Sequence, residues 1–264
     1  MNNQTSPEII QQKLHSEVRS VARVVAGKHE LLLDVSNGRL EIWAKHFADT
    51  EPELLDFIDA LPETAIYYDV GASIGHFALY AAMRIRKVIA LEPEALNFAT
   101  ASLNHFLNRE RIAGDFVLLN VAASDVLAIE HLAINLYGAG EHTKALQRAG
   151  RSEGASDARP TLHRQPVLAF PLDELTSRFS LPEPTHLKID VDGAEASVLA
   201  GAKRCLANRA LKQVFIELEA GEAEQQCSRL LAEHGFTLSE RHGVRRISGG
   251  YYEKLTNCVF VRNS

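Results

Sequence analysis

The sequence predicts an α/β fold in which a mostly parallel sheet carries helices on both faces. From Ala65 onward, short apolar runs alternate with amphipathic stretches of helical period. The segment 69–75, Asp-Val-Gly-Ala-Ser-Ile-Gly, follows the first of these runs and opens a helical stretch. A glycine-containing turn between a strand and a helix is typical of sheets that bind a nucleotide at the carboxyl ends of their strands.

The expected elements follow one another through the main domain, which we place at residues 63–264. The expected strands are Ala65–Val70, Lys87–Leu91, Phe116–Leu119, His186–Ile189, Gln213–Leu218, Phe236–Glu240 and Asn257–Val261. The expected helices are Phe77–Arg84, Glu94–Asn108 and Ala196–Leu206.

Residues 1–62 are expected to form an N-terminal cap on this domain. Apolar residues at three- and four-residue spacing predict a helix over Ile9–Val25. An Asn-Gly pair between two apolar runs predicts a hairpin with strands Leu31–Val35 and Leu40–Trp43. A second, short helix is expected over Glu51–Leu61.

Residues 138–165 are rich in Gly, Arg, Ser, Glu and His and poor in large apolar side chains. We expect a long loop here, with some helix over Thr143–Ala149. Loops of this length in compact domains are usually functional or disordered. Both a lid over a substrate and plain disorder fit the composition.

The bulk composition bounds what the protein can do. It has 264 residues, 46% of them hydrophobic, and a formal net charge of −6. The acidic balance disfavours nucleic acid as a partner, because nucleic-acid binders need a basic surface. Three widely spaced cysteines predict neither a disulfide framework nor a zinc site. No apolar stretch suits a signal peptide or a membrane span, so we expect a cytoplasmic protein that binds no membrane.

The turn after the first expected strand predicts a cofactor site. Gly71 permits a sharp turn, Ala72 and Ser73 let a ligand approach the backbone, and Gly75 permits close packing of the helix. Asp69 would repel the pyrophosphate of a dinucleotide, whereas it suits the ammonium group of S-adenosylmethionine (SAM). The alternative is a plain strand-to-helix turn without a ligand.

Residues at the ends of neighbouring strands extend this predicted site. Glu92 lies at the tip of the second strand, where an acidic residue suits the ribose hydroxyls, and Pro93 follows it. His76 begins the helix after the turn and would lie near the cofactor. The residues expected beside the adenine, at the end of the third strand, are Asn120, Ala122 and Ala123.

A second group of polar residues ends the fourth expected strand. Asp190, Asp192 and Glu195 would lie at the carboxyl edge of the sheet, beside the predicted cofactor site. The alternative is helix capping, with Asp192 as the N-cap and Glu195 three residues later as its partner.

In six stretches the sequence resembles the FkbM family of SAM-dependent methyltransferases. The stretches are YYDVGASIGHFALYAA, VIALEPEALNFATASLN, VLLNVAASD, PLDEL, HLKIDVDGAEASVLAGA and FIELE, which span residues 67–219. The sequence departs from the family pattern at Ser73, where Asn is usual, and at Asp192, where Glu is usual. The resemblance implies a Rossmann-like class I methyltransferase fold, with a seven-stranded sheet whose last strand is antiparallel. It also implies methyl transfer to an oxygen of a small-molecule or glycan acceptor, such as a sugar or a secondary metabolite.

For methyl transfer to a hydroxyl, Asp190 is the first candidate for the general base or for a group that orients the acceptor. Asp190 is also expected to contact the cofactor. Lys188 could pair with a carboxylate, or it could be a structural strand lysine. A metal-assisted variant would place Mg²⁺ between Asp190, Asp192 and either Glu217 or Glu219. Further candidate bases, each more typical of a surface or structural histidine, are His76, His142, His163 and His242.

Two other functions fit parts of the pattern. An NAD-dependent oxidoreductase would share the fold class, although Asp69 and the missing GxGxxG motif disfavour it. A non-catalytic SAM-binding protein would hold the cofactor without transferring its methyl group. The N-terminal cap could close the pocket or form the contact of a homodimer.

Overall fold

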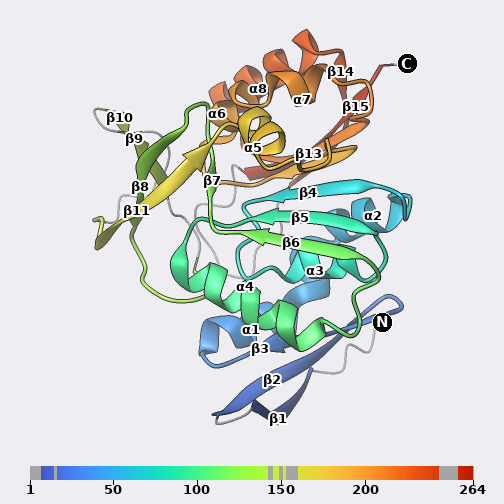
Figure 1. Cartoon of the computed structure of the whole chain (residues 1–264), viewed down its shortest axis with the longest axis vertical. Helices are drawn as coiled ribbons and strands as arrows, with labels where there is room; N and C mark the ends of the chain where they lie inside the picture. Colours follow the sequence, from blue (N-terminus) through green and yellow to red (C-terminus); the bar gives the residue numbers. More distant parts are fainter. Residues whose placement is uncertain are drawn as a thin grey trace.

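A computed structural model gives the fold of the chain (Figure 1). It describes residues 7–14, 17–141, 145–148, 151–152, 160–243 and 255–263. Its largest sheet has seven strands in the order β14-β15-β13-β12-β4-β5-β6. The strands are β4 (Ile66–Val70), β5 (Lys87–Leu91), β6 (Asp115–Leu119), β12 (His186–Ile189), β13 (Gln213–Glu219), β14 (Phe236–Gly243) and β15 (Leu255–Arg262). All seven predicted strands are confirmed, and β15 runs antiparallel to both of its neighbours.

Helices cover both faces of this sheet, as predicted (Figure 1). One face carries α3 (His76–Ala82) and α4 (Ala95–Asn108), and the N-terminal cap packs against the same side. The helices of the other face are α5 (Leu172–Arg178), α6 (Glu195–Ala200), α7 (Lys203–Ala207) and α8 (Glu222–Glu233). The single helix predicted over Ala196–Leu206 is therefore wrong. The chain turns at Gly201, where an added Cβ would lie 2.0 Å from the carbonyl oxygen of Ser124.

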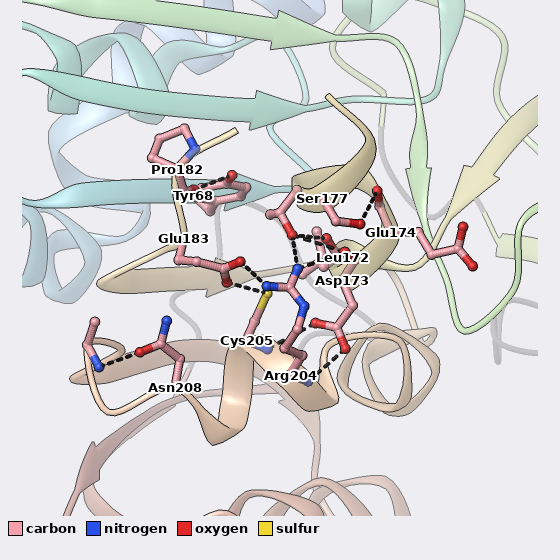
Figure 2. A network of polar contacts seen from close by, with 12 residues as sticks. Tyr68, Leu172, Asp173, Glu174, Ser177, Pro182, Glu183, Arg204, Cys205 and Asn208 are labelled. Carbon is pink, nitrogen blue, oxygen red and sulfur yellow. Dashed lines mark hydrogen bonds and ion pairs between the residues drawn. The ribbon is translucent and has the colours of Figure 1, made fainter. Parts of the chain in front are cut away.

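A polar network ties the helices of this second face together (Figure 2). The Arg204 guanidinium, on α7, donates to the Asp173 carbonyl on α5 and forms an ion pair with Glu183. The Tyr68 hydroxyl donates to the Pro182 carbonyl at 2.8 Å, which fastens the loop before β12 to β4. Tyr68 faces away from its neighbour Asp69, because successive strand residues point to opposite faces of a sheet. We therefore assign this network to the support of the fold.

The first half of the N-terminal cap differs from the prediction. The helix predicted over Ile9–Val25 is wrong, because β1 (Glu8–Leu14) and β2 (Glu17–Ala26) form an antiparallel pair there. β3 (His29–Asp34) adds a third strand beside β2. The segment is rich in Val and Ile, whose branched side chains favour strands over helices. The spacing of these apolar residues happens to match the period of a helix.

The hairpin predicted over residues 31–43 is also wrong, because its second strand is the start of a helix. Asn37 is the N-cap of α1 (Gly38–Thr50), and its side chain accepts a hydrogen bond from the Leu40 backbone N–H at 2.9 Å. Asparagine favours this position as strongly as it favours tight turns. The second helix of the cap, α2 (Pro52–Ala60), confirms the short helix predicted over Glu51–Leu61.

Two buried asparagines attach the cap to α4. The Asn108 side chain accepts from the Leu32 N–H at 2.9 Å and donates to the Leu32 carbonyl at 2.7 Å. The Asn104 side chain accepts from the Asp34 N–H at 2.8 Å and donates to the Ile74 carbonyl at 2.9 Å. These amides occupy the open edge of β3, where a further strand would otherwise bind. Asn104 thereby joins the cap to the turn that precedes α3.

A second, five-stranded sheet with the order β10-β9-β8-β11-β7 was not predicted. Its strands are β7 (Ala122–Ala123), β8 (Ala128–Ile134), β9 (Ala145–Arg148), β10 (Arg151–Ser152) and β11 (His163–Phe170). The helix predicted over Thr143–Ala149 is wrong where the structure describes it, since 145–148 is a strand. Residues 142–144, 149–150 and 153–159 of the predicted loop lie outside the described residues. The long-range pairing of β8 with β11 holds this sheet together, and composition does not reveal such pairing.

Among the described residues, no helix combines the length and the apolar character that crossing a membrane requires.

Candidate functional site

Two turns meet at the carboxyl ends of β4 and β12. In the first turn, Gly71 adopts a φ of +82° and its N–H donates to the Leu91 carbonyl at 3.0 Å. An added Cβ at Gly71 would lie 1.8 Å from the carbonyl oxygen of Asp190, in the second turn. Only glycine fits this contact. Farther along, a Cβ on Gly75 would lie 3.0 Å from the Cβ of Ala101, so Gly75 brings α3 close to α4 rather than to the sheet.

The side chain of Lys188 connects the two turns. Its Nζ lies 3.0 Å from Asp69 Oδ1 and 3.4 Å from Asp190 Oδ2, and it donates to the Gly71 carbonyl at 3.0 Å. Burial by itself lowers the pKa of Lys188, but the charges of Asp69 and Asp190 outweigh this effect and raise it. Burial raises the pKa of Asp69, and the charge of Lys188 opposes that rise. Of the two alternatives considered for Lys188, the structure shows the pairing with a carboxylate.

Glu92 lies at the tip of β5, where the predicted ribose partner belongs. Its side chain is buried, and its two carboxylate oxygens accept from the backbone N–H groups of Ser73 and Glu94, both at 2.8 Å. These two bonds fix the orientation of the carboxylate at the predicted ribose position. Asn120 donates to the carbonyls of Glu92 and Pro93 at 2.9 and 3.1 Å, which fixes the end of β6 beside this tip.

Ala122 and Ala123, predicted beside the adenine, form the short strand β7. This strand pairs with β11, so the second sheet begins at the edge of the predicted cofactor site. Ala122 belongs to a small apolar cluster that includes Ala194 and is packed by Val191, both from the turn after β12. Ala123 belongs instead to the core on the α5–α8 face of the large sheet, so the two alanines face different apolar clusters.

The turn after β12 holds its acidic residues without a capping box. α6 begins at Glu195 with Ala194 as its N-cap, and no side chain caps it, so the alternative with Asp192 as N-cap is wrong. Instead, the Glu195 carboxylate accepts from the Gly193 N–H at 2.9 Å and stabilises the turn itself. Burial raises the pKa of Glu195 to about 7, although this backbone hydrogen bond opposes the rise. Asp190 lies at the start of the turn with its side chain 28% exposed, so it faces both Lys188 and open space.

His76, predicted near the cofactor, is buried at the start of α3. Its ring packs against those of Trp43 and Phe77, with centroid distances of 5.2 and 4.3 Å. Burial and the charge of Lys188 lower its pKa to about 3, so the imidazole is neutral at working pH. Neither ring nitrogen has a hydrogen-bond partner among the described residues. A buried imidazole without a partner beside the turn suits a ligand group.

The remaining candidate histidines are placed elsewhere or not described. His163 begins β11 and packs against the Tyr137 ring, and His242 of β14 pairs with Glu240 at 3.0 Å. His142 lies outside the described residues. The structure therefore gives no contact that joins these histidines to Asp190.

The sequence analysis missed an acidic residue of the cap, Glu51. It lies between α1 and α2 and is buried, and burial followed by the charge of Asp190 raises its pKa to about 8. Glu217 of β13, named above as a candidate metal ligand, has its pKa raised by burial, by Asp190 and by Glu51. In the sequence, Glu51 before Pro52 is typical of a helix start, so no local signal marks it.

The predicted metal site finds no support in this geometry. Within the described ranges, no three His, Cys, Asp or Glu side chains are placed to hold a metal ion. Lys188 also places a positive charge between Asp69 and Asp190, where a cation would otherwise bind.

The residues present fit SAM as a cofactor. The Asp69 carboxylate is buried and pairs with Lys188, and the buried imidazole of His76 has no hydrogen-bond partner among the described residues. The turn 71–75 lies next to them, and Glu92 offers an oriented carboxylate for two ribose hydroxyls. Glu92 thus lies where the ribose of SAM would bind, and Asp69 lies where its amino-acid part would bind, at the two ends of one turn.

The seven-stranded sheet, its strand order and this pair of turns define a Rossmann-like class I methyltransferase. The chain belongs to the FkbM methyltransferase family, because the model of the methyltransferase FkbM domain matches residues 69–245, more than half of the chain. No protein of curated function matches the sequence.

Solved structures share the fold at low sequence identity. A methyltransferase FkbM from Methylobacillus flagellatus KT is 15% identical with a TM-score of 0.50, over 76% of this chain and 44% of that chain. The present chain thus spans less than half of that protein. Magnesium protoporphyrin IX methyltransferase from Synechocystis PCC 6803, solved with bound SAM, is 10% identical over 90% of this chain and 87% of that chain, with a TM-score of 0.48.

Proposed function

We propose that this protein transfers a methyl group from SAM to a hydroxyl oxygen of a sugar or a secondary metabolite. The observation that supports it best is the placement of Asp190. Its carboxylate contacts Lys188, its backbone packs against Gly71 of the cofactor turn, and part of its side chain is open. The Asp190 carboxylate therefore lies between the predicted cofactor site and the open space next to that site.

In this mechanism the chain supplies orientation and a proton acceptor. SAM, when bound, supplies an electrophilic methyl group. Asp190 would accept the proton of the acceptor hydroxyl as its oxygen takes the methyl group, which SAM would supply and thereby leave as S-adenosylhomocysteine. Lys188 fixes the orientation of the Asp190 carboxylate, and Glu195 holds the turn on which Asp190 lies. The protein's main contribution is alignment of the two reactants.

The second candidate function is SAM binding without catalysis. Family membership disfavours the oxidoreductase alternative, but it does not by itself require turnover. The half-open Asp190 beside the cofactor turn favours an enzyme over a scaffold.

Calorimetry with SAM and an assay for S-adenosylhomocysteine test the proposal. The acceptors are a library of glycans and small hydroxylated metabolites. We expect SAM to bind wild type and Asp190→Asn alike, and turnover to fall about 100-fold or more in the variant, the usual contribution of a general base. Unchanged turnover would remove Asp190 from this role, and SAM binding without turnover on any acceptor would favour the scaffold. Loss of turnover in EDTA with rescue by Mg²⁺ would restore the metal-assisted variant.

A further inference from the structure

A layer of polar side chains is enclosed between the N-terminal cap and the large sheet. On the strands it contains Asp69 of β4, Lys188 of β12, Glu217 of β13 and Asn257 of β15. Strand residues alternate between faces, and Tyr67, Phe215 and Val259 belong to the core on the cap side. Asp69, Glu217 and Asn257 each lie two positions from one of these core residues on the same strand, and Lys188 is the register partner of Phe215. All four polar side chains therefore face the cap. If the cap packed directly against the sheet with nothing between them, apolar side chains would be expected at these four positions.

The cap meets this layer with two carboxyls. The Glu53 carboxylate accepts from Asn257 Nδ2 at 2.8 Å, which fixes α2 over β15. Glu51, two residues earlier, forms no side-chain cap bond with its own helix. The charges of Asp190, Lys188, Glu53 and Asp69 all act on Glu51, and those of Asp190 and Glu51 act on Glu217. Because Glu53 binds Asn257, the register partner of Glu217, the start of α2 with Glu51 lies over the part of β13 that carries Glu217.

Two fully buried groups point into the same layer and lack a partner. The Tyr67 hydroxyl has no hydrogen-bond partner among the described residues, and Asp69 and Glu51 are the charges that act on it. Asn257 Oδ1 is likewise unpaired, although the other end of its amide binds Glu53. Buried polar groups are nearly always hydrogen-bonded in proteins. These two indicate that a polar ligand completes the layer.

We propose that Glu51 of the cap forms, together with Glu217 and Asp190, the acceptor side of the methyl-transfer site. The inference rests on the proposed function, since it assigns the acceptor-binding part of that same site. β12 and β13 place Asp190 and Glu217 side by side, because Ile189 and Ile216 are register partners. Glu51 covers them from the cap. Glu51 is a residue that positions and selects the acceptor, and Asp190 keeps the role of base.

The charges of this acceptor side restrict its ligand. Lys188 pairs with Asp69 and Asp190, and the carboxyls of Glu51 and Glu217 add groups that bind hydrogen-bond donors such as hydroxyl or ammonium groups. An acceptor whose reacting end is a phosphate or a carboxylate would meet negative charge without a compensating cation. The acceptor side therefore takes a neutral or cationic end that offers several hydrogen-bond donors.

The test needs no knowledge of the natural acceptor. Sinefungin is a SAM analogue with an amine at the position of the transferred methyl group, whereas S-adenosylhomocysteine has nothing there. The ratio of their calorimetric Kd values reports carboxylates at the transfer point. The titrations are run at pH 8.5, where the Glu51 carboxyl is largely ionised. Wild type is expected to prefer sinefungin by about tenfold or more, the effect of one charge-assisted hydrogen bond.

Glu51→Gln and Glu51→Ala are expected to lose most of this preference while their affinity for S-adenosylhomocysteine stays within about twofold of wild type. Glu217→Gln is expected to lose part of it, and it keeps the test informative if the Glu51 variants do not fold. The matched control is Glu41→Gln, an exposed acidic residue of α1, which should retain the wild-type ratio. Retention of the wild-type ratio by folded Glu51 and Glu217 variants, or no preference in wild type, would overturn the inference. Failure of wild type to bind either compound would overturn the proposed function instead.

Discussion

The cofactor side and the acceptor side of this site are built in different ways. The cofactor side uses short contiguous segments, the turn 69–75 and the strand tip at Glu92, which backbone hydrogen bonds hold in place. The acceptor side brings Glu51, Glu217 and Asn257 together from elements far apart in the chain. The cofactor side is rigid and can be predicted from the sequence, whereas the geometry of the acceptor side depends on how the cap is attached. The acceptor side can therefore change the acceptor that it binds while the cofactor side continues to bind SAM.

The largest effect is expected from Gly71→Ala, which breaks the cofactor side. The new Cβ would clash with the Asp190 carbonyl, and φ is positive, so we expect a loss of about 3–6 kcal/mol in unfolding free energy and of SAM binding. The matched control is Gly221→Ala, which also has a positive φ, but whose Cβ would meet no described atom within 4 Å. It should cost only about 1–3 kcal/mol and retain SAM binding. Urea unfolding and calorimetry measure both, and equal losses would refute the close-contact explanation.

Lys188→Met tests the brace that joins the two sides. It leaves the buried Asp69 carboxylate without a counter-charge, so we expect a loss of about 3–5 kcal/mol. The double variant with Asp69→Asn should recover part of this loss, because the uncompensated charge is then removed as well. Urea unfolding of the four proteins of this cycle measures the coupling. Strictly additive losses would show that the ion pair contributes nothing specific.

Asn108→Ala separates the two sides by loosening the cap. It removes the hydrogen bonds to both backbone groups of Leu32, so we expect a loss of about 1–3 kcal/mol. The affinity for S-adenosylhomocysteine should hardly change, whereas the preference for sinefungin should fall. Calorimetry with both compounds checks this split. Equal weakening of both compounds would mean that the cap supports the cofactor side too.

An effect of the opposite sign, a stabilisation, is expected from Glu51→Gln. The pKa of Glu51 rises from its ordinary 4.5 to about 8 on folding, because of burial and the charge of Asp190. Between these pH values the native state keeps a proton that the unfolded state has lost, so wild-type stability falls as pH rises through this range. The variant lacks this penalty, and since one pKa unit corresponds to about 1.4 kcal/mol, its Tm should exceed that of wild type by about 10 degrees at pH 8.5 but not at pH 4. Thermal unfolding across pH measures it, and parallel pH profiles would contradict the assignment.

The sequence predicted the parts of the molecule that local patterns encode. The seven strands of the large sheet, Gly71, Glu92 and the acidic end of β12 follow from short apolar runs and the residues that end them. The cap was misread because its valines suit a strand pairing that spacing alone did not reveal, and because Asn37 serves a helix cap as readily as a turn. The second sheet depends on pairing between β8 and β11 across some thirty residues of chain. Glu51 has no local signature at all, since only its burial beside Asp190 distinguishes it.

The hydrogen bond between Glu53 and Asn257 has a consequence for the order in which the protein can mature on the ribosome. It joins an early helix to β15, a strand that inserts between β13 and β14 after both have been synthesised. The turn at Gly71 and its partners up to Asp190 can assemble before β15 has been synthesised. The contact between the cap and β15 forms only afterwards, so the proposed acceptor side is completed later than the cofactor turn.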